Sequence, residues 1–227
     1  MVIWTVRLNV SAQTVSAAKN FLSPDERTRA DAFRNEQALR NYIISHAALR
    51  QILANHLKLN PTEIPFRTGT YGKPALAETV ASQLEFNLTH SGNLALVAVA
   101  HGAEVGIDVE TVRAMPDALR LAERFFSAAE SEALNALPAD DQGAAFLNLW
   151  TRKEAFVKAT GLGIANALIR FEVTMGANAT VKAIDGDPRL AAQWTLHAFT
   201  PAPGYLAAVA VRSPAAQFAF REFTTAT

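Results

Sequence analysis

Two carboxylates stand two residues apart in the stretch Gly106-Ile107-Asp108-Val109-Glu110. The surrounding apolar and β-branched residues predict a strand over 105–110. Because side chains alternate between the two faces of a strand, Asp108 and Glu110 should point the same way, with Ile107 and Val109 pointing into the protein. Two adjacent carboxylates repel, and a site that keeps both ionised usually holds a cation. A solvated strand end would show the same pattern, so its meaning depends on what else lies nearby.

A third acid, Glu154, belongs to a segment with helical periodicity. Residues four apart share a helix face, so Trp150, Glu154 and Lys158 form one stripe. On a wet surface Glu154 and Lys158 would simply be an ion pair worth about 0.3–0.5 kcal/mol. Apolar neighbours such as Phe156 predict that little of this helix is fully solvated, which favours a place in a site.

Together, Asp108, Glu110 and Glu154 would supply three hard oxygen ligands, with no Cys or His beside them. Such a set favours Mg²⁺, with Mn²⁺ as the alternative ion, over zinc. Magnesium keeps several waters, so its remaining positions suit phosphate oxygens. Lys158, one turn beyond Glu154, could then neutralise phosphate charge or a leaving oxygen.

Other stretches carry groups suited to a polyanion. Gly72-Lys73-Pro74 displays a lysine on a turn, and Thr89-His90-Ser91-Gly92 offers hydroxyls and an imidazole that can bond phosphate oxygens. Each also has an ordinary reading, as a surface lysine and a structural histidine. The chain contains four arginines between 27 and 40, a run that is either a solvated helix face or the rim of an anion site. Neither a Walker-type phosphate loop nor Gly-x-Gly-x-x-Gly is present.

Hydrophobic periodicity and turn signals predict the elements that position these groups. Strands are expected at 2–10, 84–88, 94–100, 105–110, 171–173, 180–184, 193–199 and 205–211. Helices are expected from Pro24, over 36–57, 116–126 and 127–137, and from 140 to about 160. The segment 66–74, with two glycines and a proline, reads as a turn or an exposed loop.

The chain contains a weak internal repeat. Leu94-Ala95-Leu96-Val97-Ala98-Val99 resembles Leu206-Ala207-Ala208-Val209-Ala210-Val211, and a long helix precedes a hairpin in both halves. We therefore expect an α+β, sandwich-like fold of two similar subdomains related by a pseudo-two-fold, each with a long helix on a small, mostly antiparallel sheet. The predicted boundary separates 1–105 from 106–227, which puts the acidic strand near a seam, where pockets form preferentially.

Composition narrows the class of protein. Half of the 227 residues are hydrophobic and 19% are charged, which is typical of a packed globular chain. Lys plus Arg (21) equals Asp plus Glu (21), so no overall charge favours nucleic acid or a membrane surface. With no cysteine, signal-peptide pattern or long apolar run, a cytoplasmic protein is expected.

The order of the motifs resembles the 4′-phosphopantetheinyl transferases, in particular the large pseudo-dimeric type that activates surfactin synthetase. The resemblance extends over about residues 20 to 165. It rests on Gly-Lys-Pro (72–74), Phe-Asn-Leu-Thr-His-Ser (86–91), Gly-Ile-Asp-Val-Glu (106–110), Arg-Phe-Phe-Ser (124–127) and Trp-Thr-Arg-Lys-Glu-Ala-Phe-Val-Lys (150–158).

The resemblance implies Mg²⁺-dependent transfer of phosphopantetheine from coenzyme A to a serine of an apo acyl or peptidyl carrier protein, releasing adenosine 3′,5′-bisphosphate. By this resemblance the metal ligands are Asp108, Glu110 and Glu154. Glu154 is also the general base, directly or through a metal-bound water, and Lys158 stabilises or protonates the departing oxygen. Coenzyme A would be bound by Lys73, Thr89, His90, Arg40, Asn41, Asp108 and Lys158.

This chain departs from the family pattern at several positions. Asn41 follows Arg40 where the family often has Ser or Thr, and Thr89 replaces a more usual serine. Asp25 and Thr28 stand near positions where some relatives carry lysines for the 3′-phosphate, so Arg27 or Arg29 would have to substitute. Glu130 is an additional acid near the predicted site. One chain supplies both halves of the site, so a monomer is expected, with a carrier-docking surface on the helices between 116 and 137.

Two other functions use the same residues. A Mg²⁺-dependent hydrolase of nucleotides or pyrophosphates would need the same three acids, with water as the nucleophile. A coenzyme-A-binding or carrier-docking module would have the pocket without turnover. The presence of all three acids and both site lysines favours the transferase over these alternatives.

Overall fold

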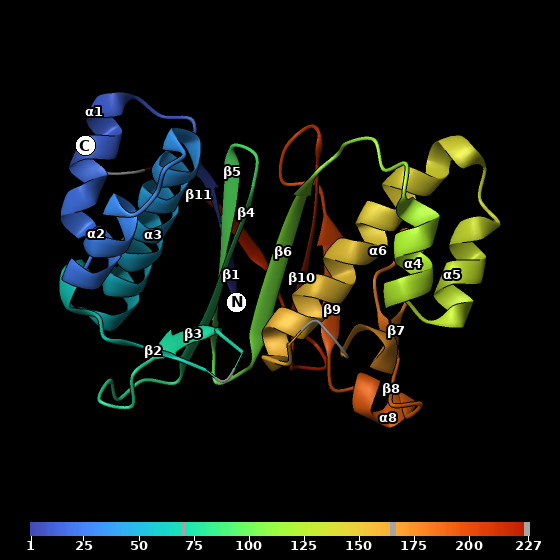
Figure 1. Ribbon diagram of the computed structural model, residues 1–227. Coiled ribbons are helices and arrows are strands. Elements are labelled where there is room, and N and C mark those ends of the chain that lie inside the picture. Colours follow the sequence, from blue (N-terminus) through green and yellow to red (C-terminus); the bar gives the residue numbers. More distant parts are fainter. Residues whose placement is uncertain (70, 164–166, 225–227) are drawn as a thin grey trace.

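The computed structural model describes residues 1–69, 71–163 and 167–224, and they form four layers: helices, sheet, sheet, helices (Figure 1). The first sheet has the order β11 (Ala219–Phe223), β1 (Val2–Arg7), β5 (Leu94–His101), β4 (Leu84–Ser91). The second has the order β6 (Val105–Thr111), β10 (Tyr205–Val211), β9 (Thr195–Phe199). The helices of residues 12–57 cover the outer side of the first sheet, and those of residues 118–160 cover that of the second (Figure 1). All pairs within these sheets are antiparallel except β1 with β11. The expected α+β fold is confirmed, with one long helix on each small sheet.

The first half begins with strand β1 (Val2–Arg7), followed by α1 (Ala12–Ala18) and α2 (Pro24–Asp31). A capping box starts α2: the N–H of Glu26 donates to the Ser23 hydroxyl, and Glu26 accepts from the backbone N–H of Ser23. The long helix α3 spans Glu36–Leu57, as its apolar stripe predicts, and Lys58 ends it in the left-handed conformation. The hairpin β4 (Leu84–Ser91) and β5 (Leu94–His101) follows.

The segment 66–74 is not the exposed loop expected from its glycines and proline. It contains most of a second hairpin, β2 (Phe66–Thr68) paired with β3 (Pro74–Leu76), whose turn carries Tyr71 and Gly72. The turn signals were correct for the tip, but the flanking strands are too short to leave an alternating pattern in the sequence.

The second half begins with strand β6 (Val105–Thr111). Helices α4 (Ala118–Phe125), α5 (Ala128–Asn135) and α6 (Ala139–Thr160) follow. The remaining elements are β7 (Phe171–Val173), β8 (Val181–Ile184), the short helix α8 (Pro188–Ala191), β9 (Thr195–Phe199), β10 (Tyr205–Val211) and β11 (Ala219–Phe223). Strand β11 returns to the first sheet and pairs with β1. The division at residue 105 stays a prediction. The last strand comes from the second half of the sequence but belongs to the sheet of the first half, so the two sheets do not correspond strictly to 1–105 and 106–227.

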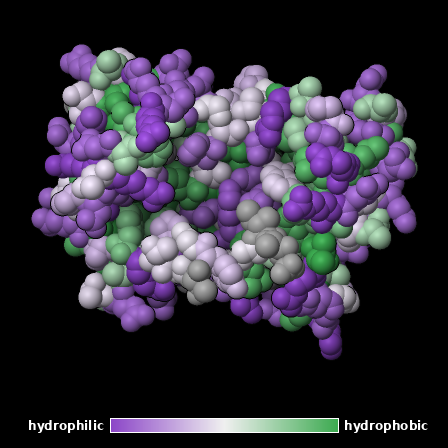
Figure 2. Space-filling view, in the orientation of Figure 1, coloured by the Kyte–Doolittle hydropathy of each residue, from purple (hydrophilic) through white to green (hydrophobic). Residues whose placement is uncertain are grey.

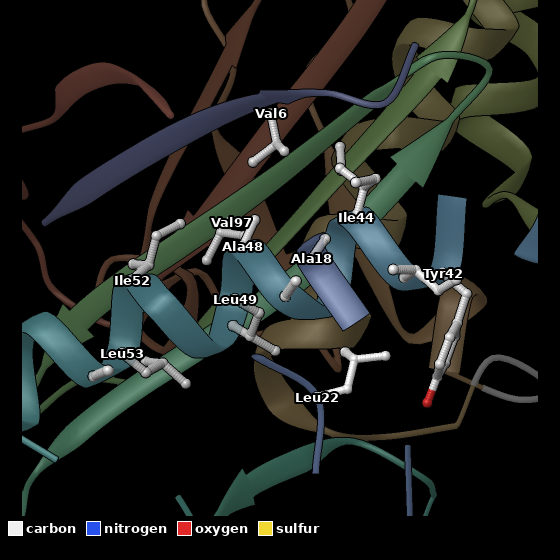
Figure 3. Packing of buried hydrophobic residues seen from close by; sticks show 14 of the residues in the cluster. Val6, Ala18, Leu22, Tyr42, Ile44, Ala48, Leu49, Ile52, Leu53 and Val97 are labelled. Atoms are coloured by element: carbon white, nitrogen blue, oxygen red, sulfur yellow. The ribbon is translucent and has the colours of Figure 1, made fainter. Parts of the chain in front are cut away.

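Strand β5 is buried on both faces, which explains its unbroken apolar sequence. Val97 faces α3, and the close-up shows it beside Ala48 and Ile52 in the core of the first half (Figure 3). Leu96, from the opposite face, belongs to a second apolar layer between the two sheets, together with Ile107 of β6. This layer fixes the position of β6 in the middle of the molecule.

One glycine sets the distance between β6 and α6. A Cβ atom on Gly106 would lie 2.2 Å from both the carbonyl oxygen of Ala155 and the amide nitrogen of Ala159. No real Cβ tolerates such contacts, so only glycine lets the two backbones approach this closely. The face of β6 that carries Asp108 therefore lies directly against the helix that carries Glu154 and Lys158.

Candidate active site

Two of the three predicted acids lie near each other at the middle of the molecule. Asp108 on β6 and Glu154 on α6 are both buried, with exposed fractions of 5% and 6%. Lys158 joins them: its ammonium donates to Asp108 Oδ1 at 2.6 Å. The helix-surface pair of Glu154 with Lys158 is therefore not formed, because Lys158 reaches across to β6 instead.

Burial makes both carboxylates costly to ionise. It raises the pKa of Glu154 from 4.5 to about 7, with the Asp108 and Glu110 charges adding to the effect and Lys158 opposing it. Burial also raises the pKa of Asp108, although the charge and hydrogen bond of Lys158 act against the rise. Asp108 Oδ2 and Glu154 Oε1 have no hydrogen-bond partner. Unpaired buried oxygens of this kind call for a cation or donor from outside the chain.

Glu110 lies on the same face of β6 but at the edge of the site. Its carboxylate binds Arg113 at 2.8 Å and accepts from the Ser91 hydroxyl at 3.3 Å. Among the described residues, no three Asp, Glu or His side chains gather as a preformed metal cage. The proposed ligand triad is not assembled here, because Arg113 and Lys158 neutralise two of its members. It stays a prediction.

The donor set nevertheless fits a hard divalent ion. The two unpaired oxygens belong to carboxylates, which Mg²⁺ and Mn²⁺ prefer as ligands. An added cation would offset the burial cost and the repulsion from neighbouring carboxylates that raise the pKa values of Asp108 and Glu154. Asp108 and Glu154 could hold the ion as they stand, and Glu110 would join after releasing Arg113.

Strand β4 holds β6 through a ladder of polar side chains. The backbone N–H of Ile107 donates to Asn87 Oδ1 at 2.9 Å, and the Thr89 hydroxyl donates to Asp108 at 3.2 Å. Ser91 completes the ladder by accepting from the Thr111 N–H at 3.1 Å. Sequence reasoning assigned Thr89 to phosphate and gave Asn87 no role. The signal was present, since residues 87, 89 and 91 are polar at the spacing of one strand face.

The structure places the remaining predicted ligands differently. The Lys73 ammonium donates to the carbonyls of Val105 (3.0 Å) and Ala159 (2.9 Å), so it joins the hairpin tip to the seam. Arg40 donates to the Val10 carbonyl at 2.6 Å, and Asn41 donates to the Gly92 carbonyl at 3.1 Å. These contacts hold loops in place, and a role in binding coenzyme A stays a prediction for all three residues. His90 reaches solvent beside the site, where partial burial and then the Lys158 charge lower its pKa.

Two cavities meet at the hairpin tip. The smaller, about 270 Å³, runs past Glu154 and Lys158 between Tyr71 and Gly163. The larger, about 790 Å³, lies in the first half between α2, α3 and the β2–β3 hairpin. Both include Gly72 in their walls. In the orientation of Figure 1, the surface is hollowed near the middle of the molecule, where hydrophilic and hydrophobic residues lie side by side (Figure 2).

The larger cavity has charged groups of both signs in its wall: Arg29 and Arg50, and the acids Asp25, Glu26 and Glu63. Arg29 lies in its wall, 5.8 Å from the centre of the Tyr42 ring, and makes no ion pair within the described residues. Arg50 also lines it but is bound to Glu26 and to two backbone carbonyls. Arg27 donates to the Asn20 carbonyl and is not part of the wall. Of the two arginines expected to replace the missing lysines, the geometry favours Arg29.

Comparison with known proteins gives the family. The model named 4′-phosphopantetheinyl transferase superfamily matches residues 104–210, and the model named 4′-phosphopantetheinyl transferase, N-terminal, matches residues 7–102. The chain is 36% identical to 4′-phosphopantetheinyl transferase HetI of Nostoc sp. strain PCC 7120, over 92% of this chain and 86% of that protein. The chain belongs to the 4′-phosphopantetheinyl transferase superfamily.

Other relatives agree. The chain is 35% identical to 4′-phosphopantetheinyl transferase psf-1 of Bacillus pumilus, over 89% of this chain and 84% of that protein. It is 31% identical to 4′-phosphopantetheinyl transferase Sfp of Bacillus subtilis strain 168, over 69% of this chain and 67% of that protein. The family and enzyme class expected from the motif order are thus confirmed. None of the helices among the described residues is long and apolar enough to span a membrane.

Proposed function

We propose that this chain transfers the 4′-phosphopantetheine group of coenzyme A to a serine of an apo acyl or peptidyl carrier protein in a reaction that needs Mg²⁺. Family membership supports the reaction. The observation that carries the site is the meeting of Asp108, Glu154 and Lys158 at the seam, where two buried carboxylate oxygens lack a partner. Mn²⁺ is the alternative ion. A cytoplasmic location and a monomeric state remain predictions.

The two cavities suit the two ends of coenzyme A. The larger one offers aromatic surface and the Arg29 guanidinium, which fit an adenosine with a 3′-phosphate. The smaller one passes Glu154 and Lys158, where the phosphates would lie, and its glycine-containing wall leaves room for the narrow pantetheine arm. The diphosphate of coenzyme A would then lie across the turn at Gly72, which lines both cavities.

The residues have separable roles in the transfer. Mg²⁺, held by Asp108 and Glu154 with Glu110 in reach, would neutralise the diphosphate charge. Glu154 accepts the proton of the carrier serine. The serine oxygen forms a bond to the β-phosphorus while the bond from that phosphorus to the bridging oxygen breaks, releasing adenosine 3′,5′-bisphosphate. The Lys158 ammonium, 2.6 Å from Asp108, would stabilise the departing oxygen of a diphosphate bound beside that carboxylate.

The test is the intact mass of a purified apo carrier protein incubated with this chain, coenzyme A and Mg²⁺. The proposal expects a gain of one phosphopantetheine, prevented by a chelator and restored by excess Mg²⁺. A carrier without its serine is the control. Cleavage of coenzyme A with no gain on any carrier would identify a hydrolase, and binding without cleavage would identify a docking module. Either result would reject the transferase.

Arg29 provides a prediction about the coenzyme A 3′-phosphate. Replacing Arg29 with Gln should raise the KM for coenzyme A about 10- to 150-fold, since a charge-assisted hydrogen bond contributes about 1.5–3 kcal/mol. Dephospho-coenzyme A lacks the 3′-phosphate, so with it the variant and the wild type should have equal KM values. Arg27→Gln is the matched control and should change neither value. An equal loss with both substrates would place the 3′-phosphate elsewhere.

A further inference from the structure

A second buried ion pair lies behind the site, on the side of α6 that faces away from Asp108. The Lys153 ammonium donates to Glu130 Oε2 at 2.7 Å and to the Phe171 carbonyl at 2.8 Å. Lys153 has no exposed surface, and the exposed fraction of Glu130 is 6%. Glu130 was predicted to be an additional acid near the site. In the structure Glu130 lies behind α6 and binds Lys153, not Lys158.

Both carboxylate oxygens of Glu130 and the ammonium of Lys153 have hydrogen-bond partners. Glu130 Oε1 accepts from the Val173 N–H at 2.8 Å, and Oε2 also accepts from the Ser127 N–H at 2.9 Å in a capping box. The Lys153 ammonium lies 4.5 Å from the centre of the Phe171 ring. The network therefore joins α5, α6 and β7 at one point.

Stability alone does not account for such a pair. Taking two charges out of water costs several kcal/mol per ion, and well-packed apolar residues of similar volume often give an equal or higher stability. What an apolar pair cannot supply is direction, because van der Waals packing tolerates small rotations and slides while hydrogen bonds to a carbonyl and an N–H do not. The best-attested role of buried polar or ionic groups is to select one arrangement of the packed elements over competing ones.

The feature that this ion pair would fix is the rotation of α6 about its own axis. Lys153 and Glu154 are consecutive, so any rotation that moves Lys153 also moves the Glu154 carboxylate. Arg152 adds a second clamp on the same side, with its guanidinium bound to the carbonyls of Thr174 and Gly176. On the opposite side the close approach at Gly106 prevents α6 from shifting toward β6.

We propose that the Glu130–Lys153 pair is a positioning device that fixes the direction of the Glu154 carboxylate toward Asp108. The proposal rests on the proposed transferase function. Neither residue touches the substrate or the reacting atoms. Their effect reaches the chemistry through the backbone of α6.

The test compares the wild type with the double variant Glu130→Leu/Lys153→Met, which removes both charges and keeps the volume. The unfolding midpoint in denaturant should fall, because the variant leaves the N–H groups of Ser127 and Val173 and the Phe171 carbonyl without a partner. The kcat should fall at least about tenfold, since a displacement of 1 Å can cost about 100-fold. The KM for coenzyme A should stay within about twofold, and Mg²⁺ affinity, measured by calorimetry with coenzyme A present, should weaken about tenfold or more.

Leu147→Ala is the control for a purely structural effect, because Leu147 is buried elsewhere on α6. It should lower the unfolding midpoint and leave kcat and Mg²⁺ affinity unchanged. If the double variant does not fold, Glu130→Gln, which keeps an acceptor oxygen, takes its place with the same readouts. A folded variant with wild-type kcat and Mg²⁺ affinity would overturn the proposal. An inactive wild type would reject the proposed function instead, so the two failures are distinguishable.

Discussion

Replacing Glu154 with Gln is expected to reduce phosphopantetheine transfer by about 10²–10⁴-fold, the usual contribution of a positioned general base, and more if the metal is also lost. The buried Glu154 carboxylate carries an oxygen with no partner and is influenced by the charges of Lys158 on the same helix and of Asp108 on β6. The amide is almost the same size, so the packing of α6 should persist. The measurement is the single-turnover rate of carrier modification, with circular dichroism as the check on folding.

The same variant should remove a pH effect on stability. The folded-state pKa of Glu154 is raised from 4.5 to about 7, so the folded protein binds this proton more tightly than the unfolded chain. The resulting stabilisation is complete below pH 4.5 and is lost as the pH rises to about 7. The shift corresponds to about 3 kcal/mol in metal-free protein. The free energy of unfolding of the wild type, relative to Glu154→Gln, should therefore fall over this window.

Glu222→Gln serves as the control, because Glu222 is exposed on β11 and has no predicted role in binding or catalysis. It should keep both the transfer rate and the pH dependence of the wild type. Transfer by Glu154→Gln within a few fold of wild type would contradict the role of Glu154. A pH dependence that is unchanged in the variant would show that Glu154 is not the group that titrates.

The second large effect is expected for Gly106→Ala. The added Cβ would collide with backbone atoms of Ala155 and Ala159, which cannot rotate away, so β6 and α6 must separate. Such overpacking typically costs about 1–3 kcal/mol of unfolding free energy. The separation also moves Asp108 away from Glu154, and a shift of about 1 Å can reduce kcat about 100-fold. Denaturant unfolding and steady-state kinetics measure the two losses.

Gly143→Ala is the matched control for this substitution. Gly143 also lies in α6, but a Cβ there would be 3.6 Å from Met115, an ordinary contact. Because alanine favours a helix over glycine, this variant should gain roughly 0.5–1 kcal/mol and keep its activity. A Gly106→Ala protein with wild-type stability and kcat would contradict the inferred close approach between β6 and α6.

Local signals in the sequence predicted most of the elements. Helix α3 begins after Asn35, whose side chain accepts from the Ala38 N–H, and its apolar stripe ends at Leu57. The alternation around Asp108 correctly gave the strand and the shared face of the two acids. Strand β11 was missed because it is short and mostly exposed, and its pairing with β1 is what makes it a strand.

Contacts between distant segments account for what the sequence could not predict. Lys73 was expected to be free for phosphate, but the carbonyls it binds belong to Val105 and Ala159, 32 and 86 residues away. Glu130 was placed near the site, yet its partner depends on which way α6 is turned. A sequence pattern gives the face of an element, and the packing of elements decides what that face meets.

The most direct test of the metal site is calorimetric titration of Mg²⁺ into the chain with coenzyme A present, for the wild type and for Asp108→Asn. We expect saturable binding to the wild type and affinity weakened at least about tenfold in the variant, since Asp108 carries one of the two unpaired buried oxygens. Binding of equal affinity to both proteins would contradict the assignment. It would place the metal away from the seam where Asp108, Glu154 and Lys158 meet.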